Sequence, residues 1–501
     1  YFFILQKQNI MKRRQYKTKS YIIIFKGGIF MAEFAETLNG YVSIVNGWVW
    51  GPVMLILLFG THLFLTIRTR VIQLHIFKAI KLSVTKDSSA EGDISQFGAL
   101  TTALAATIGT GNIVGVATAI AAGGPGAVLW CWLTGVVGIA TKYGEALLAV
   151  KYRVKTNDGS MLGGPMYALE LGVGEHYGKS LGRVLGIIFA LLAGIAAFGI
   201  GNMTQGNSIS VMVQDTFGVS PIVTGLILMI LTGVVVIGGV KSIAKVCEKL
   251  VPLMAFFYII GCIAIIFINH SYVVPAIKEI FSSAFSARAM GGGFVGATVI
   301  TAARYGIARG LFSNESGLGS APIAAAAAQT RNPVRQALVG MTGTFWDTVI
   351  VCALTGIVLV SSIIKDPTGL EGLSGGNLTS AAFNAIGGIG PIVLTVGLIT
   401  FAWSTILGWS YYGERAWEYL AGKKAVFPFR VVWVFVVFIG CVTALDLVWN
   451  IADTLNACMA FPNLVSLLLL SGVIVSETRK YLWEDNLDAT STDVIPQVDK
   501  N

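Results

Sequence analysis

The chain has 501 residues, of which 54% are hydrophobic and only 12% charged, and its mean hydropathy is +0.73. Soluble domains carry about 25% charged residues, so this composition excludes a soluble protein and predicts a polytopic membrane protein. The net charge of +9 then indicates basic loops on one side of a membrane rather than nucleic-acid binding. Six scattered cysteines and four distant histidines form no disulfide or metal-ligand pattern.

Residues 1–30 differ from the rest of the chain. They are strongly basic, begin with Tyr1 and precede Met31, which opens a more ordinary N-terminus. No signal-peptide cleavage pattern follows them. We expect this stretch to be a non-native or disordered extension.

Apolar runs of about 20 residues are long enough to cross a bilayer as helices. Such runs predict eleven transmembrane helices, at about 42–66, 95–122, 125–150, 183–214, 220–238, 243–268, 292–329, 335–362, 389–419, 428–444 and 447–475. The first helix and its loop form a segment 31–94. The polar, acidic segment 476–501 is expected to be a disordered cytoplasmic tail.

The distribution of Lys and Arg predicts the orientation. The loops after the first, third, fifth, seventh and ninth helices are rich in both residues, whereas the opposite loops contain Lys278, Arg288 and Lys365. Because cytoplasmic loops carry the excess of positive charge, this pattern places the N-terminus outside and the C-terminus in the cytoplasm.

The second predicted helix contains a break signal. Gly109 and Gly111 flank Thr110, and Asn112 follows directly. Glycine permits local unwinding, and the freed backbone groups are tolerable in a membrane only where they line a polar cavity. There, N–H groups suit a carboxylate and carbonyls suit a cation. The alternative is a packing face of small residues, which Gly111 and Gly115 also fit.

Ten helices remain after the first, and they divide into two sets of five, 95–270 and 271–475. An odd number of helices per set gives the sets opposite topology, as in transporters with inverted repeats, and predicts a second broken helix at the start of the second set. Residues 310–323 provide it. Gly317-Leu-Gly-Ser320 resembles Gly109-Thr-Gly-Asn112, and Pro322 prevents a regular helix.

Five longer motifs resemble the alanine or glycine:cation symporter family. They are Thr107-Ile-Gly-Thr-Gly-Asn-Ile-Val-Gly115, Gly123-Gly-Pro-Gly126, Lys142-Tyr-Gly-Glu145, Gly163-Gly-Pro-Met-Tyr167 and Arg304-Tyr-Gly-Ile-Ala-Arg-Gly-Leu-Phe-Ser-Asn-Glu-Ser-Gly317. The resemblance runs from about Leu38 to Val475. It implies sodium-coupled uptake of alanine or glycine on a LeuT-like fold with one extra N-terminal helix.

A zwitterionic amino acid needs three kinds of partner. Thr110 and Gly111 can bind its carboxylate, and the matching motif of LeuT-like transporters does so. Candidate acceptors for its ammonium group are Asn202, Gln205 and Asn314. Trp403 is expected to line the pocket for its side chain. Asn202 and Gln205, three residues apart on one helix face, could instead bond a neighbouring helix. Asn314 could cap the broken helix, and Trp403, which resembles the family's pocket tryptophan, could serve packing.

Sodium needs about five or six oxygen ligands. Ser404 and Thr405 resemble the Ser/Thr pair of the sodium site shared by this fold, and the carbonyls of Ala105, Ile108 and Phe401 would complete it. The alternative is that both hydroxyls bond carbonyls of their own helix.

Charged residues inside membrane segments are functional candidates. Asp347 and Glu315 could support proton coupling, whereas Arg304, Arg309, Glu145 and Asp453 are expected in structural or gating ion pairs. No catalytic or ATP-binding motif stands in a suitable context, so an enzyme is the weakest interpretation.

The sequence therefore predicts a Na⁺-coupled symporter for small neutral amino acids, alanine or glycine, in a plasma membrane of prokaryotic type. The alternatives are a proton-coupled symporter, with H⁺ as the co-transported ion, and a channel or sensor on the same scaffold. The expected partners are the amino acid and the lipid bilayer, with no nucleic acid and no obligatory protein partner.

Overall fold

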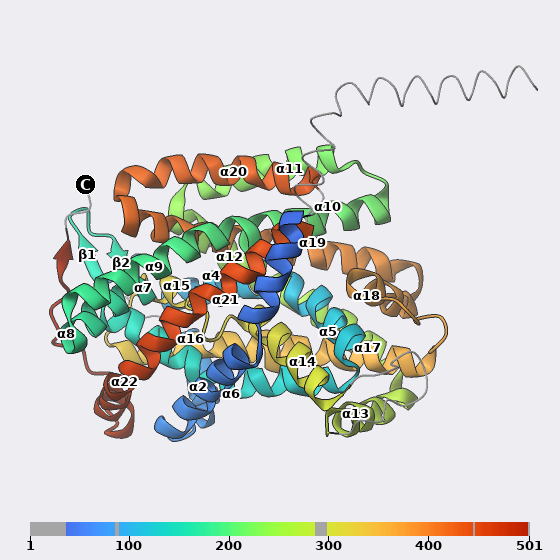
Figure 1. Cartoon of the computed structure of the whole chain (residues 1–501), viewed down its shortest axis with the longest axis horizontal. Coiled ribbons are helices and arrows are strands. Elements are labelled where there is room, and N and C mark those ends of the chain that lie inside the picture. The colour runs from blue at the N-terminus through green and yellow to red at the C-terminus, as the bar shows by residue number, and fades with distance from the viewer. Residues whose placement is uncertain (1–36, 86–89, 286–297, 444–445, 499–501) are drawn as a thin grey trace, which may run out of the picture.

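The computed structural model describes residues 37–85, 90–285, 298–443 and 446–498; the predicted extension 1–30 lies outside them. Regular structure in the described part is almost entirely helical, which confirms the all-α class (Figure 1). Seven of its helices are long and apolar enough to span a membrane, or nine if each of two bent pairs counts as one span. The count of eleven stays a prediction.

The N-terminal part of the described chain leads into the first set of five helices. It contains the helix Thr37–Val49, α2 (Pro52–Arg68), η1 (Ile72–His75) and α3 (Ile76–Ser83). The predicted first helix is bent by 42° between Val49 and Pro52. The first set comprises α4 (Gln96–Thr107) with η2 (Gly111–Gly115) and α5 (Val116–Gly123), α6 (Gly126–Lys151), α9 (Lys179–Phe198) with η4 (Gly199–Met203) and α10 (Thr204–Phe217), α11 (Pro221–Val236), and α12 (Gly239–Ile268).

The second set repeats the order of the first. It comprises α14 (Val299–Asn314) with α15 (Pro322–Ala326), α16 (Pro333–Thr344) with η5 (Phe345–Cys352) and α17 (Ala353–Lys365), α19 (Gly390–Ala421), α20 (Val426–Val442), and α21 (Asp446–Leu469). Each set thus begins with a broken helix, as predicted. Connecting elements that the sequence analysis did not predict are α13 (His270–Phe285), α18 (Gly375–Phe383), η6 (Asn384–Ile389) and η7 (Lys423–Ala425).

Side-chain caps explain several helix boundaries. Ser95 precedes α4, and its hydroxyl accepts a hydrogen bond from the Gly98 N–H at 2.8 Å. Asn332 precedes α16, and its Oδ1 accepts from the Arg335 N–H at 3.0 Å, with Pro333 at the first helical position. Both patterns satisfy N–H groups that have no partner inside the helix.

Large apolar side chains are exposed along the outer faces of several long helices. Examples are Ile188 on α9, Ile230 and Val234 on α11, and Phe256 and Phe257 on α12. An exposed apolar surface this extensive is unfavourable in water and matches lipid. The chain is therefore a multi-pass membrane protein.

The two ends of the molecule differ. The end that we call the tail side carries β1 (Val154–Thr156), β2 (Met161–Leu162) and β3 (Gln497–Val498), while α13 and α18 lie at the opposite end (Figure 1). Strand β1 pairs antiparallel with β2 and parallel with β3. The short elements α7 (Pro165–Tyr167), η3 (Ala168–Val173) and α8 (Gly174–Tyr177) follow β2, and α22 (Ser471–Thr478) and η8 (Arg479–Trp483) follow α21.

The expectation of a disordered tail is wrong for the described residues up to 498. The Asn332 amide donates to the carbonyls of Leu487 at 2.8 Å and Ala489 at 2.9 Å, and Lys151 pairs with Asp493 at 2.7 Å. The polar composition of this segment suits these contacts with basic residues and backbone groups of the tail side.

Candidate functional site

The first broken helix unwinds where the sequence predicted. Helix α4 ends at Thr107, and Ile108 has an extended ψ of 93°. The α4 half and the η2–α5 half meet at an angle of 48°. The N–H of Gly109 donates to Oδ1 of Asn112 at 2.9 Å, so Asn112 bridges the break with its own side chain.

Two oxygen atoms beside this break are buried without a hydrogen-bond partner in the described part of the chain: Oγ1 of Thr110 and Oε1 of Gln205. The Gln205 amide nitrogen is already used, because it donates to the Ile200 carbonyl at 2.9 Å. A Cβ placed on Gly109 would lie 2.5 Å from Oγ1 of Thr405 and 3.5 Å from Oε1 of Gln205. Buried polar atoms normally have partners, so this arrangement points to a bound polar ligand.

A cavity of about 480 Å³ borders the break on the side away from β1–β3. Thr110 lines it, together with apolar side chains such as Val114 and Met212. Farther out, Arg309 of α14 and Asp453 of α21 approach to 4.0 Å. Both residues were expected in ion pairs, although their partners were not predicted, and this pair connects two helices at the edge of the cavity.

The residues expected to bind sodium lie close together. The Ser404 hydroxyl is 3.2 Å from the Ala105 carbonyl and 2.8 Å from the Phe401 carbonyl, and the Thr405 hydroxyl is 3.1 Å from the Phe401 carbonyl. Ile108 is the residue at which α4 unwinds, so its carbonyl leaves the helical direction. The group offers hydroxyl and carbonyl oxygens, which suit a hard cation. The hydroxyls also bond carbonyls of their own helix, as the alternative predicted.

The second broken helix unwinds between Asn314 and Pro322. Glu315 is a non-glycine residue with a positive φ of 56°, and Gly317 and Gly319 have φ of 90° and 85°. Oε1 of Glu145, from α6, accepts hydrogen bonds from the N–H groups of Gly317 and Gly319, each at 3.0 Å. This carboxylate therefore satisfies backbone donors that the break frees.

Further side chains complete the bracing of the second break. Asn463 of α21 donates to Glu145 at 2.7 Å and to the Gly317 carbonyl at 2.9 Å. The Glu315 carboxylate accepts from the Trp409 indole at 2.8 Å and from the Ser320 hydroxyl at 2.6 Å. The second break is thus held by side chains from α6, α19 and α21.

Asp347 connects the two broken helices. Its carboxylate accepts from Asn112 at 2.7 Å, from Ser313 at 2.9 Å and from Thr348 at 2.6 Å. A Cβ on Gly111 would lie 3.1 Å from the Cα of Ser313, so the two helices are in direct contact here. A side chain at this position would require the neighbouring helix to shift by a few tenths of an ångström.

Three predicted substrate residues make other contacts. The Asn202 amide donates to the Trp433 carbonyl of α20 at 3.0 Å, and the Trp403 indole donates to Thr232 of α11 at 3.1 Å. In the described part of the chain, neither residue lines the cavity, nor does Gln205, and Oδ1 of Asn202 is also buried without a hydrogen-bond partner. Oδ1 of Asn314 accepts from the Ser316 N–H at 2.9 Å, and its amide donates to Thr348 at 3.1 Å. Ser316 lies between α14 and α15, so this is a turn contact inside the break and not the helix cap given as the alternative.

The residues that brace the second break were not predicted from the sequence. Asn463 and Trp409 were not selected, and Glu145 was expected in an ion pair instead of a contact with backbone N–H groups. Lys142 was noted only as part of a motif, yet it is 4% exposed and its Nζ has no hydrogen-bond partner in the described residues. A buried lysine inside a membrane helix was the available signal.

These features define a class of membrane protein. Two discontinuous helices in corresponding positions of two helix sets, in contact beside a buried polar site, are the architecture of secondary transporters. Residues 35–494 match the model of the sodium:alanine symporter family, so the chain belongs to this family. Membership confirms the predicted family and the prediction of a transporter rather than an enzyme.

Individual relatives agree with this assignment. The chain is 54% identical to the sodium/alanine symporter AgcS of Methanococcus maripaludis over 443 residues, which cover 88% of this chain and 96% of that protein. It is 35% identical to the putative sodium/proton-dependent alanine carrier protein YrbD of Bacillus subtilis, with 90% and 92% covered. It is 34% identical to the probable sodium/glutamine symporter GlnT of Bacillus subtilis, with 89% and 91% covered.

Proposed function

We propose that this chain transports alanine together with Na⁺, and that both bind at the break of the first broken helix. The observation that carries the proposal is that the buried oxygens of Thr110 and Gln205, beside the Ala105–Ser404 contact, have no hydrogen-bond partner among the residues that the structure describes. Solute and ion would thus bind next to each other, which is the geometry that coupling needs. Na⁺ entering with the solute releases about 2.3 kcal/mol per charge per 100 mV of membrane potential.

The amino acid would bind in one orientation. Its carboxylate would meet Thr110 and Gly111, where η2 begins, because a helix N-terminus favours negative charge. Its ammonium group would donate to Oε1 of Gln205, an acceptor that no donor in the described part of the chain reaches. Val114 and Met212 would leave room for a small side chain.

Na⁺ would bind the oxygens of Ala105, Ile108, Phe401, Ser404 and Thr405. None of these groups titrates near neutral pH, which favours sodium over a proton as the coupled ion. The Asp347 carboxylate already accepts hydrogen bonds from three side chains, and the Glu315 carboxylate accepts from two. Proton coupling remains the second candidate, because a relative's name includes it.

We also propose the orientation. The Lys-rich and Arg-rich loops belong to the tail side, so this side would face the cytoplasm of a prokaryotic cell. The cavity at Thr110 would then open outward and receive external solute. Release would require the tail side to open.

Labelled alanine uptake into proteoliposomes tests the proposal. We expect uphill uptake under an inward Na⁺ gradient and none when choline replaces Na⁺. Equal uptake under a pH gradient without Na⁺ would assign the coupling to Asp347 or Glu315. Failure to accumulate alanine under either gradient would overturn the proposed function.

A matched pair of variants on α19 tests the ion site. Thr405→Val removes a hydroxyl beside Gly109, whereas Thr400→Val removes one that bonds only carbonyls of its own helix in the described structure, at 2.9 Å. Thr405→Val should raise the Na⁺ concentration for half-maximal uptake about tenfold, the effect of about 1.4 kcal/mol. Thr400→Val should leave it unchanged. Equal responses of the two variants would remove the site assignment.

A further inference from the structure

The ends of the two broken helices are joined to each other on the tail side. Residues 91–94 lead into α4, and residues 326–329 end and follow α15. The N–H of Asp93 donates to the Ala327 carbonyl at 2.8 Å, and the N–H of Gln329 donates to the Ile94 carbonyl at 2.8 Å. Ile94 and Ala328 form a parallel β-bridge. We call residues 91–94 and 326–329 together the clip.

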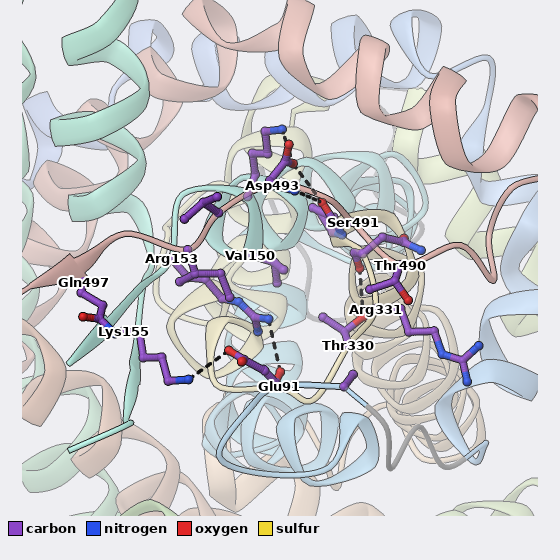
Figure 2. Close-up of a pocket in the computed structure, with 16 residues that line it drawn as sticks. Glu91, Val150, Arg153, Lys155, Thr330, Arg331, Thr490, Ser491, Asp493 and Gln497 are labelled. Atoms are coloured by element: carbon purple, nitrogen blue, oxygen red, sulfur yellow. Dashed lines mark hydrogen bonds and ion pairs between the residues drawn. The ribbon is translucent and has the colours of Figure 1, made fainter. Parts of the chain in front are cut away.

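One side chain from outside both broken helices holds the clip. The guanidinium of Arg153, which follows α6, donates to the carbonyls of Ala328 at 2.8 Å, Ala326 at 3.3 Å and Glu91 at 3.2 Å. Figure 2 shows this side chain directed at Glu91 beneath the tail segment. Arg153 thus bonds both halves of the clip at once.

The arrangement uses properties that are specific to arginine. Arg153 is only 5% exposed, and the three groups to which it donates are neutral carbonyls. The Glu91 carboxylate instead pairs with Lys155 at 3.2 Å. A planar guanidinium can reach three acceptors in fixed directions, whereas a lysine presents one compact ammonium group.

The clip lies on the tail side, beside a pocket of about 440 Å³ that Glu91 and Arg153 line (Figure 2), while the cavity at Thr110 lies on the other side. The backbones in the clip are very close, because a Cβ on Gly92 would lie 2.4 Å from the Gln329 nitrogen. On the opposite side, Thr110 borders a cavity of about 480 Å³. Solute that enters beside Thr110 could leave on the tail side only if the ends of the broken helices separate.

We infer that Arg153 holds the inner gate of the transporter closed. Its hydrogen bonds keep the two halves of the clip together, and they must break before the solute can leave on the tail side. The inference rests on the proposed transport function. In each cycle the three Arg153 bonds break and form again. Arg153 touches neither the first break nor the cavity in the described structure, so it acts through the ends of the helices rather than on the solute.

Cysteine accessibility in the full-length protein tests the gate directly. Gln96 is 3% exposed and bonds Thr330 at 3.1 Å, so Gln96→Cys reports opening of the clip. A membrane-impermeant maleimide would label it, with the protein lacking this substitution as background. Arg153→Gln should raise the labelling rate roughly tenfold, as loss of charged hydrogen bonds implies. The control Lys155→Gln, which removes only the Glu91 carboxylate pair, should not.

Transport gives a second readout. Loss of the clip depopulates the form that is closed on the tail side, so Arg153→Gln should raise the external Na⁺ needed for half-maximal uptake. If Arg153→Gln fails to fold, Arg153→Lys is the second variant. It keeps the positive charge but loses the planar guanidinium, so its labelling rate should lie between that of the parent and a tenfold increase. Unchanged labelling with reduced uptake would overturn the gate. If the parent protein accumulates no alanine while Arg153→Gln still raises the labelling rate, the proposed function is overturned and the role of Arg153 in holding the clip stands.

Discussion

Both broken helices unwind at glycine residues, but the polar groups at the two breaks differ in whether the protein provides their hydrogen-bond partners. At the first break, Thr110 and Gln205 keep buried oxygens without partners in the described structure, and a cavity lies alongside. At the second break, the N–H groups of Gly317 and Gly319 donate to Glu145. The Glu145 carboxylate does at the second break what the solute carboxylate is proposed to do at the first. At the second break the protein itself supplies the acceptor for the freed N–H groups, whereas at the first break the proposal gives this role to the solute.

The largest expected effect is the loss of stability when the Glu145 carboxylate is removed. Glu145→Ala leaves the Gly317 and Gly319 N–H groups and the Asn463 amide without their buried acceptor, which should cost roughly 3 kcal/mol or more of stability. Thermal unfolding in detergent measures the loss. Glu175→Ala, on the exposed surface of α8, is the control and should be neutral. A Glu145→Ala protein as stable as the parent would refute the bracing role.

Gln205→Ala should act on binding instead of folding. It removes the acceptor proposed for the solute ammonium group, so the alanine Kd should rise roughly 10- to 100-fold, the range for a charged hydrogen bond. Equilibrium binding of labelled alanine measures this. Thr118→Ala, which removes a hydroxyl that lines the cavity at Thr110 but bonds its own helix at 2.8 Å, should bind normally. Parallel losses in both variants would contradict the assigned orientation.

Glycine substitutions should separate the breaks more finely. Gly109→Ala places a methyl group 2.5 Å from the Thr405 hydroxyl, so uptake should be lost while the fold persists. Gly317→Ala forces a side chain into a positive φ of 90°, which should cost about 1–2 kcal/mol of stability. Uptake and thermal unfolding should be measured for both. An equal loss of stability in the two variants would contradict a binding role for the first break and a structural role for the second.

Trp403→Phe should have a small effect. Its indole donates to Thr232 of α11, and loss of one such bond is worth about 1 kcal/mol. Uptake should stay within about twofold of the parent, a shift of at most about 0.4 kcal/mol. Abolished uptake in a normally stable protein would restore the pocket role that the sequence suggested.

The smallest effect concerns pH at the tail side. The hydrogen bond from Lys151 holds the pKa of Asp493 below its usual range. A lowered carboxyl pKa stabilises the folded form above the unfolded pKa, and this contribution is lost only as pH falls through the folded pKa. Protease sensitivity of the tail should therefore stay constant from about pH 8 to pH 5, above the ordinary Asp value of about 3.9. Release within that interval would contradict the pairing.

Sequence patterns predicted what local chemistry determines. The breaks follow from Gly109, Gly111, Gly317 and Pro322, and long helices follow from apolar runs. The shared face of Asn202 and Gln205 was wrong for a local reason. The π-helix Gly199–Met203 adds a residue to the turn. Gln205 consequently faces Gly109, while Asn202 bonds α20.

Contacts between distant segments could not be predicted in this way. The partners of Glu145 come from the second break and from α21, and the order of the tail depends on Asn332 and Lys151. Apolar run length carries no information on such pairings. Helices α13 and α18 were missed because they connect the spans and are shorter than a membrane crossing.

The parallel pairing of β3 with β1 also constrains biosynthesis. Lys151 and Asp493 are 342 residues apart in the chain, and every membrane helix described between them must be synthesised before they can meet. A nascent chain that has inserted all these helices still lacks this contact. Completion of the tail side is therefore a late, post-insertion event, and a protein truncated before β3 would expose strand β1 as an open edge to proteases in the cell.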